Sequence, residues 1–451
     1  ADQLYESLQR AIDEDFPEDP IDIEKIFSTW ELNPGVPVLH VDVNGTDMTF
    51  TQERFFLNGQ TSDDIWSIPI NYAVGSNPDF SITKPDFWLH ERSKSISSAN
   101  APKPWTENDC IIVNARATGY YRVDYDIDTW LHIINHLHGP FHEIDPINRG
   151  QLVDDSFNLA RNGRIGFDIS LGIMDYLRNE INYIPWALAN RANILLNRWL
   201  IGTVVYSDYQ AYIRSNVELV YNRFGASIKD NDTRVQRFTR AIAIDLACRA
   251  RSEQCLTDTS EQLQNLVQSG ILIAPDVQQT IYCNGARLAN SATVEFLQNR
   301  LQSTNRQPER GFILAGLGCV ENVTLLFNHL FLAIRPGFSF TNTERFNILN
   351  SPLNHGDASL QVMIDFIRLN YGGINLIDSS FVANLVSNIA TRVSSEIMFA
   401  EFESLTEHLE LNGALTADQR NNFKAAAREI LAWQDDNLFD FIRYFYINRP
   451  Q

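Results

Sequence analysis

The sequence predicts a β-sandwich followed by a large all-α superhelical domain. First, the hydrophobic period changes near Tyr125 from short β-rich runs to apolar residues recurring at three and four positions. Second, turn segments such as NPG, NGTD and GSNPD separate the early runs, whereas short polar or glycine breaks separate the later ones. Third, 451 residues exceed one ordinary hydrophobic core, so two or three domains are expected.

These observations divide the chain into three segments. Residues 1–29 predict a helical tail, because Leu4, Leu8 and Ile12 share one helix face. Residues 30–127 carry short strand-like runs such as VPVLHVDV and WSIPINYAV, typical of a β-sandwich. Residues 128–451 hold about fifteen amphipathic helical patterns with no fixed sequence period, which favours HEAT-like helix pairs stacked into a bowl.

Charge and hydropathy exclude several functions. The net charge of −20 disfavours contact with nucleic acid or anionic lipid. No apolar run reaches the length of about eighteen residues that crosses a bilayer. The chain opens with ADQLYESLQR, which is amphipathic and lacks a signal-peptide core, so we expect residue 1 to be the start of a mature piece or of a fragment made for expression.

The cysteines and sequons favour an extracellular protein. The five cysteines form no C-x-x-C pair and fit two local bridges plus one free thiol. They are Cys110, Cys248, Cys255, Cys283 and Cys319. Three N-x-[ST] sequons, at Asn44, Asn231 and Asn322, are candidate glycan acceptors. A cytosolic protein with stray cysteines and chance sequons remains the alternative on these features.

One histidine-rich stretch raises the question of a metal site. HIINHLHGPFHE, residues 132–143, contains four histidines: His132, His136, His138 and His142. His132 and His136 have the H-x-x-x-H spacing of zinc peptidases, and Asp155 lies nineteen residues beyond His136, where a third ligand would stand. The catalytic glutamate expected after the first histidine is replaced by Ile133. We therefore interpret the stretch as a helix face and its trailing loop; an adventitious surface metal site is the alternative.

Seven blocks of sequence occur in a recognisable order. They are WELNPGVPVLHV (30–41), FTQERFFL (50–57), WSIPI (66–70), NARATGYYRVDYD (114–126), INRGQLVDDSFNLA (147–160), YLRNEINYIPWALA (176–189) and IYCNGA (281–286). Each is similar to a block in the C-terminal half of the M1-family zinc aminopeptidases of the aminopeptidase N group, most of all the insect midgut branch. The blocks lie between residues 30 and 286, and the resemblance that they carry is taken to cover nearly the whole chain.

The resemblance implies that this chain is non-catalytic. The family's zinc-binding and substrate-binding motifs belong to a catalytic domain that would precede residue 1, with residues 1–29 as its last helices. We therefore expect no catalytic, cofactor-binding or metal-ligating residue here, and zinc only in the parent enzyme. The resemblance also implies disulfides Cys248–Cys255 and Cys283–Cys319, which leaves Cys110 reduced.

The implied parent is a lipid-anchored, cell-surface metallopeptidase that removes N-terminal residues from peptides. In it, this region would cap the peptide cavity, contact the catalytic domain, support a homodimer and carry glycans. In insect relatives it would also be a docking surface for bacterial pore-forming toxins. The alternative is a free-standing helical-repeat interaction protein without peptidase parentage, which shares only the architecture.

Overall fold

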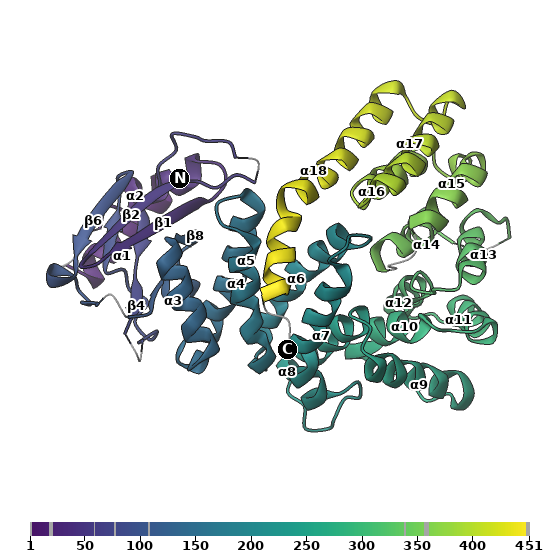
Figure 1. Ribbon diagram of the computed structural model, residues 1–451, viewed down its shortest axis with the longest axis horizontal. Helices are drawn as coiled ribbons and strands as arrows, with labels where there is room; N and C mark the ends of the chain where they lie inside the picture. The colour runs from purple at the N-terminus through teal and green to yellow at the C-terminus, as the bar shows by residue number, and fades with distance from the viewer. Residues whose placement is uncertain are drawn as a thin grey trace. The chain divides into compact units, whose positions relative to one another are not determined.

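The computed structural model describes residues 2–17, 21–57, 59–75, 78–106, 109–337, 340–355 and 360–447. The chain divides into two compact units, residues 1–176 and 177–451 (Figure 1). Within the described ranges every strand precedes Ile127, and the regular elements after it are helices. This confirms the predicted change from strands to helices. The division into domains at residues 30 and 128 stays a prediction.

In the described part of the first unit, eight short strands make three sheets. The strands are β1 (Pro37–Asn44), β2 (Asp47–Arg54), β3 (Ile68–Ile70), β4 (Tyr72–Val74), β5 (Phe87–Leu89), β6 (Ser93–Ser97), β7 (Ile111–Val113) and β8 (Arg122–Tyr125). The largest sheet has the order β6-β2-β1-β8, in which only β1 and β8 run parallel. Strand β3 pairs with β5, and β4 pairs with β7.

The larger sheet buries one face because its side chains alternate. Leu39 and Val41 of β1 and Met48 and Phe50 of β2 are fully buried, as the period of two predicts. The Phe50 ring meets Phe87 of β5 edge to face, 5.4 Å between centroids. The inner face therefore packs on the small sheets, and the outer face keeps its polar residues.

Five helices accompany the sheets. They are α1 (Asp2–Asp15), α2 (Ile23–Leu32), α3 (Ile127–His138), α4 (Pro146–Asn162) and α5 (Phe167–Asp175). Helix α3 starts where it does because the Asp126 carboxylate caps the Thr129 amide. Helix α4 begins with Pro146 after the capping Asp145, and it ends at Gly163, whose φ of 80° suits glycine.

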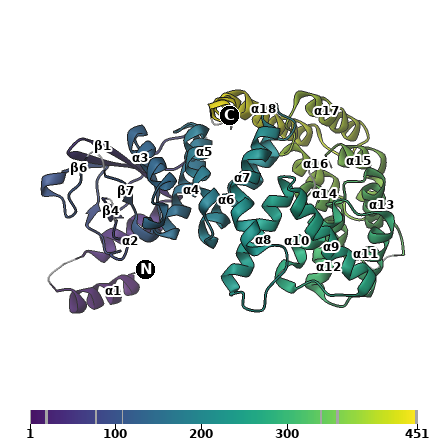
Figure 2. The same cartoon turned by 60° about the horizontal axis from the view of Figure 1, so that its bottom comes forward.

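The second unit contains only helices among its described regular elements. They are α6 (Tyr183–Leu200), α7 (Tyr206–Phe224), α8 (Arg234–Arg249), α9 (Glu253–Ser269), α10 (Gln278–Ala286), α11 (Ser291–Ser303), α12 (Gln307–Leu317), α13 (Val323–Ile334), α14 (Asn342–His355), α15 (Leu360–Asn375), α16 (Phe381–Ala390), α17 (Glu396–Leu411) and α18 (Ala417–Ile447), with the 3-10 turns η4 (Tyr176–Asn179) and η5 (Pro275–Val277). Each even-numbered helix contacts the next, and α18 returns to α6. Figures 1 and 2 show α9, α11, α13, α15 and α17 outside this series.

Side-chain hydrogen bonds close this series of helices. Gln434 of α18 donates from Nε2 to the carbonyl oxygens of Trp199 (2.5 Å) and Ser394 (2.9 Å). The Ser394 hydroxyl donates to the carbonyl of Ile201 (2.6 Å). The indole rings of Trp199 and Trp433 pack beside these bonds, 4.7 Å between centroids. Residues 235 positions apart are thereby held together at the junction of α6, α16 and α18.

Arginine side chains join successive helices. Three arginines on even-numbered helices each donate to a carbonyl in the last turn of the preceding helix. The pairs are Arg240 with Phe224, Arg310 with Leu301, and Arg345 with Ala333. The side chain of Arg240 is fully buried, and it also pairs with Asp232. Each guanidinium thus satisfies a carbonyl that the helix itself leaves without a partner.

The Arg240→Met variant tests this contact. The substitution keeps the length of the side chain but removes the guanidinium from the Asp232 carboxylate, which keeps only the Lys229 amide as a donor, and from the Phe224 carbonyl. We expect the free energy of unfolding to fall by about 3–5 kcal/mol. Urea denaturation followed by circular dichroism measures the loss.

The matched control is Arg237→Met, one turn earlier on α8. The pair of Arg237 with Asp276 is about one-third exposed on both sides (36% and 34%). Such a surface pair contributes up to about 1 kcal/mol. Similar losses in the two variants would contradict a special role for the buried arginine.

A buried histidine predicts acid sensitivity. His329 of α13 is fully buried, and within the described ranges neither ring nitrogen has a hydrogen-bond partner. Burial lowers its pKa to about 3. The unfolded chain, with a histidine pKa near 6.5, therefore binds the proton first, and stability is lost as the pH falls below that value.

We expect His329→Leu to reduce this loss. Between pH 7 and pH 5 the wild-type chain should lose about 2 kcal/mol more stability than the variant. Chemical denaturation of both proteins at the two pH values measures the difference. An identical pH dependence of the two unfolding free energies would show that His329 is protonated without cost in the fold.

Candidate functional site

The histidine stretch forms the end of α3 and the following 3-10 turn η3 (Phe141–Glu143). His132, His138 and His142 are exposed, and His136 is half-buried. Ile133, at the position where a peptidase needs its glutamate, is completely buried in the core of the unit. The expected helix face and trailing loop are therefore present.

His136 and His138 contact groups of neighbouring segments and not each other. Nε2 of His136 lies 3.2 Å from Oε2 of Glu143. Burial lowers the pKa of His136, and the Glu143 carboxylate opposes that shift. Nε2 of His138 lies 3.3 Å from the carbonyl oxygen of Gly172 and 3.8 Å from Asp175. Both rings take part in the packing of the first unit.

Both carboxylate oxygens of Asp155, the candidate third ligand, accept hydrogen bonds from residues of β8. Its Oδ1 accepts from Arg122 at 2.8 Å, and its Oδ2 accepts the Val123 amide at 3.0 Å. The carboxyl is buried, and burial raises its pKa to about 7 against the opposing attraction of Arg122. Asp155 therefore fixes α4 against the edge of the sheet.

The described residues do not fit a zinc ion. Within them no three histidine, cysteine, aspartate or glutamate side chains are grouped so that they could hold a metal. A structural zinc needs four ligands and a catalytic zinc three. The H-x-x-x-H spacing, which any helix produces at i and i+4, brings no third ligand here.

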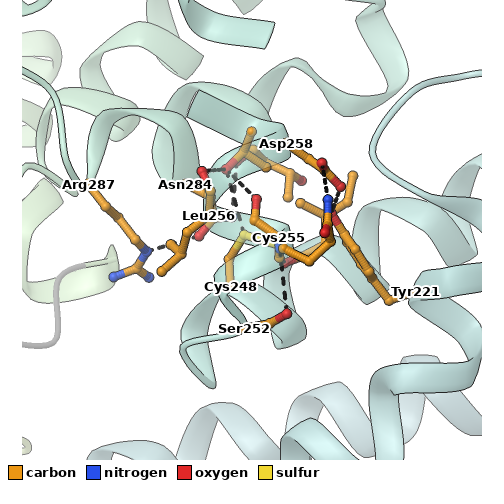
Figure 3. The surroundings of a disulfide bond; sticks show 12 residues. Tyr221, Cys248, Ser252, Cys255, Leu256, Asp258, Asn284 and Arg287 are labelled. Atoms are coloured by element: carbon orange, nitrogen blue, oxygen red, sulfur yellow. Dashed lines mark hydrogen bonds between the residues drawn. A yellow bond between two sulfur atoms is a disulfide. The ribbon is translucent and has the colours of Figure 1, made fainter. Parts of the chain in front are cut away.

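Two disulfides lie in the second unit. Cys248 at the end of α8 is bonded to Cys255 at the start of α9, with 5.2 Å between their Cα atoms (Figure 3). Cys283 of α10 is bonded to Cys319, which follows α12, with a Cα separation of 5.3 Å. Both pairs are those implied by the resemblance, and all four sulfurs are buried.

The remaining cysteine is a buried free thiol. Cys110 precedes β7 in the first unit. Burial raises its pKa to about 12, with Asp109 and Glu143 acting in the same direction. Since the thiolate is the reactive form, this side chain has no nucleophilic role at neutral pH.

The three sequon asparagines are all exposed. Asn44 ends β1 at the hairpin to β2, and Asn231 lies in the turn before α8. Asn322 caps α13 by accepting the Leu325 amide at 3.1 Å through Oδ1, which leaves Nδ2 as the atom for a sugar. Exposure is compatible with glycosylation, which stays a prediction.

The sequence did not indicate two surface depressions. One of about 640 Å³ lies between α7 and the α8–α9 turn and is lined by residues that include Arg214, Tyr221 and Arg251. The other, of about 490 Å³, lies on the outer sheet face beside Asn44. Both depressions are formed by residues that are distant in the sequence. The sequence indicated only the turn after Asn44, beside one of them.

Comparison with known proteins assigns the family. Residues 110–420 match the model of the ERAP1-like C-terminal domain. An aminopeptidase N from Plutella xylostella is 30% identical over 380 residues, which are 82% of this chain and 40% of that protein. The chain belongs to the M1 aminopeptidase N family and corresponds to its C-terminal region.

Further aminopeptidase N relatives show the same coverage. A membrane alanyl aminopeptidase from Heliothis virescens is 26% identical over 87% of this chain, and an aminopeptidase N from Bos taurus is 27% identical over 90%. The chain spans about two fifths of the length of these relatives. In the ranges that the structure describes, no helix combines the length and apolar character needed to cross a bilayer.

The two disulfides of this aminopeptidase N region should stabilise it unequally. Cys283 and Cys319 are 36 positions apart, whereas Cys248 and Cys255 are 7 apart. Loop-closure entropy predicts about 4 kcal/mol for the longer loop and about 2.5 kcal/mol for the shorter. We expect the Cys283→Ser/Cys319→Ser double variant to lose more stability than Cys248→Ser/Cys255→Ser.

Denaturant unfolding of the two double variants beside the wild type measures both losses. Reduction of the wild-type protein under denaturing conditions provides the control, because refolding without either bridge should combine the two losses. A larger loss from the short loop would show that loop entropy does not rank these bonds.

Proposed function

We propose that this chain is the non-catalytic C-terminal region of a cell-surface zinc aminopeptidase that removes N-terminal residues from peptides. The observation that carries the proposal is the match of residues 110–420 to the ERAP1-like C-terminal domain, joined to coverage of only two fifths of the relatives. Within the described ranges no group of histidine, cysteine, aspartate or glutamate side chains could hold a metal ion. Zinc would then be held by the catalytic part of the parent.

The architecture supports a capping role. In the proposal, residues 1–29 are the tail of the catalytic domain, 30–127 form a β-sandwich, and 128–451 form a HEAT-like bowl. Contacts between successive even-numbered helices, and the return of α18 to α6, are what a closed bowl requires. Such a bowl would cover the peptide cavity of the parent and exclude water from it.

The proposed location is the outer cell surface. Two buried disulfides favour an oxidising compartment, and three exposed sequons offer glycan sites at Asn44, Asn231 and Asn322. The relative from Heliothis virescens is named a membrane alanyl aminopeptidase. A lipid anchor on the parent would hold the protein at the membrane without a membrane-spanning helix.

The proposed partners follow from the same reading. The proposed partners are the catalytic domain of the parent, peptides, and a second copy of the chain in a homodimer. Bacterial pore-forming toxins are a further proposed partner, as the resemblance to the insect midgut branch implies, and the exposed surface of this region would be their docking site. The net charge of −20 disfavours nucleic acid.

Metal content and peptidase activity test the proposal directly. The isolated chain should contain no stoichiometric zinc and should not hydrolyse leucine or alanine anilides. The full-length parent should contain zinc and should hydrolyse these anilides. Loss of a general base alone costs about 10²–10⁴-fold in rate. Elemental analysis and anilide assays of the two proteins give the comparison.

His136→Ala is the control for the histidine stretch. The variant should have the same zinc content and the same lack of turnover as the wild-type chain. One equivalent of zinc with turnover that His136→Ala abolishes would contradict the proposal. The matched 380 residues are 40% of the Plutella xylostella relative, which therefore has about 950 residues. A natural protein of only 51.5 kDa would favour the free-standing interaction protein instead.

A further inference from the structure

The outer face of the four-stranded sheet contains a shallow depression of about 490 Å³. It crosses β1, β2 and β6, which lie side by side in Figure 1. Its lining residues are Asp42, Asn44, Asp47, Thr49, Ser95, Ile96 and Ser97. One of them, Asn44, is a sequon asparagine. The depression is otherwise rich in hydroxyls and carboxylates.

Strand register places these groups in two rows. Asn44 lies opposite Asp47, which lies opposite Ser97 on the far strand. Asp42 lies opposite Thr49, which lies opposite Ser95. The hydroxyl oxygens of Thr49 and Ser95 are 2.8 Å apart. A polar floor three strands wide therefore begins directly at the sequon asparagine.

The hairpin holds Asn44 in a fixed place relative to this floor. The Gly45 carbonyl accepts from Trp105 Nε1 at 3.3 Å, and the Thr46 carbonyl accepts the Ser98 amide at 2.7 Å. Gly45 has a φ of 60°, which the tight turn requires. Among the described residues the exposed Asn44 side chain has no hydrogen-bond partner, so it is available at the edge of the depression.

We propose that the depression seats the first sugars of an N-linked glycan on Asn44. The inference rests on the extracellular, glycosylated state proposed above. Attachment replaces one hydrogen of Nδ2 by C1 of the sugar, with a lipid pyrophosphate as the leaving group and a proton released. The glycan core then lies along the sheet, where the turn at Gly45 directs it.

The chemistry of the floor suits an N-acetylated sugar. Its hydroxyl and amide groups donate to Asp42 and Asp47, and its oxygens accept from Thr49 and Ser95. The depression, of about 490 Å³, is open along the outer sheet face, so a sugar chain can lie in it without entering a closed cavity. Asn231, in the exposed turn before α8, provides a second sequon for comparison within the same chain.

Enzymatic deglycosylation of the native protein tests the seat. The chain is secreted from a eukaryotic host, and peptide mapping gives the occupancy of Asn44 and Asn231. Native protein is then treated with a peptide N-glycosidase. We expect release from Asn44 to be about tenfold slower than release from Asn231, because a seated sugar must leave its contacts before the enzyme binds.

Ser95→Trp fills the depression while it leaves the sequon intact. Release from Asn44 should then reach the rate at Asn231. Ser93→Trp is the matched control: it lies two residues earlier on the same exposed face of β6, outside the depression, and should leave release slow. Asp42→Ala removes one acceptor without adding bulk and should accelerate release by several-fold. It tests the seat independently if Ser95→Trp does not fold.

The outcomes separate two failures. An unmodified Asn44 in the secreted protein contradicts both the seat and the glycosylated state at this site. An occupied Asn44 that is released as fast as Asn231 contradicts only the seat. Slow release that persists in folded Ser95→Trp and in Asp42→Ala also overturns the seat, since protection would then come from elsewhere.

Discussion

The donation of a buried arginine to the end of a neighbouring helix is the contact on which the second unit depends. An α-helix leaves its last carbonyls without partners and carries a partial negative charge there. At the end of α7, Arg240 donates to a free carbonyl and places a positive charge beside the negative helix end. It also binds Asp232, because the guanidinium group donates in several directions. Two less deeply buried arginines, Arg310 and Arg345, donate in the same way at the ends of α11 and α13. Each contact ties the end of one helix to the next helix in the series.

This internal use of cations affects the electrostatics of the chain. The sequence has 36 lysines and arginines against 56 acidic residues, and several arginines are buried. Burial lowers the pKa of Arg392 to about 10, and the neighbouring Arg198 adds to the shift. Arg240 and Arg287 each also pair with a carboxylate, of Asp232 and Glu321, so their charges are compensated within the fold. The excess of acidic over basic residues therefore remains on the rest of the chain, in line with the argument against nucleic acid.

The sequence predicted what depends on neighbours along the chain. The change of hydrophobic period near Tyr125 marks the last strand, because strand and helix periodicities arise from local backbone geometry. The turn segments between the early runs acted in the same local way. The histidine stretch shows the limit of such reasoning. Spacing put His132 and His136 on one helix, but only the fold shows that Asp155 belongs to Arg122 and Val123.

Two other features lay beyond the sequence for the same reason. The partner of each capping arginine is a backbone carbonyl, which has no side-chain signature. The depression beside Asn44 needs the register of β1, β2 and β6, and β6 lies some fifty residues from β1 in the chain. The disulfide pairing came from resemblance rather than from pattern, since each of five choices of free cysteine leaves four cysteines with three possible pairings.

A fold held through backbone acceptors places few demands on sequence. A contact between two side chains constrains both residues, whereas an arginine bound to a carbonyl constrains only the arginine. The closing bonds from Gln434 and Ser394 to backbone oxygens work in the same way. Such a frame can persist at the 26–30% identity seen with the relatives, while the residues between the contacts change. The exposed surfaces are then free to acquire glycans and partners without disturbing the helices that support them.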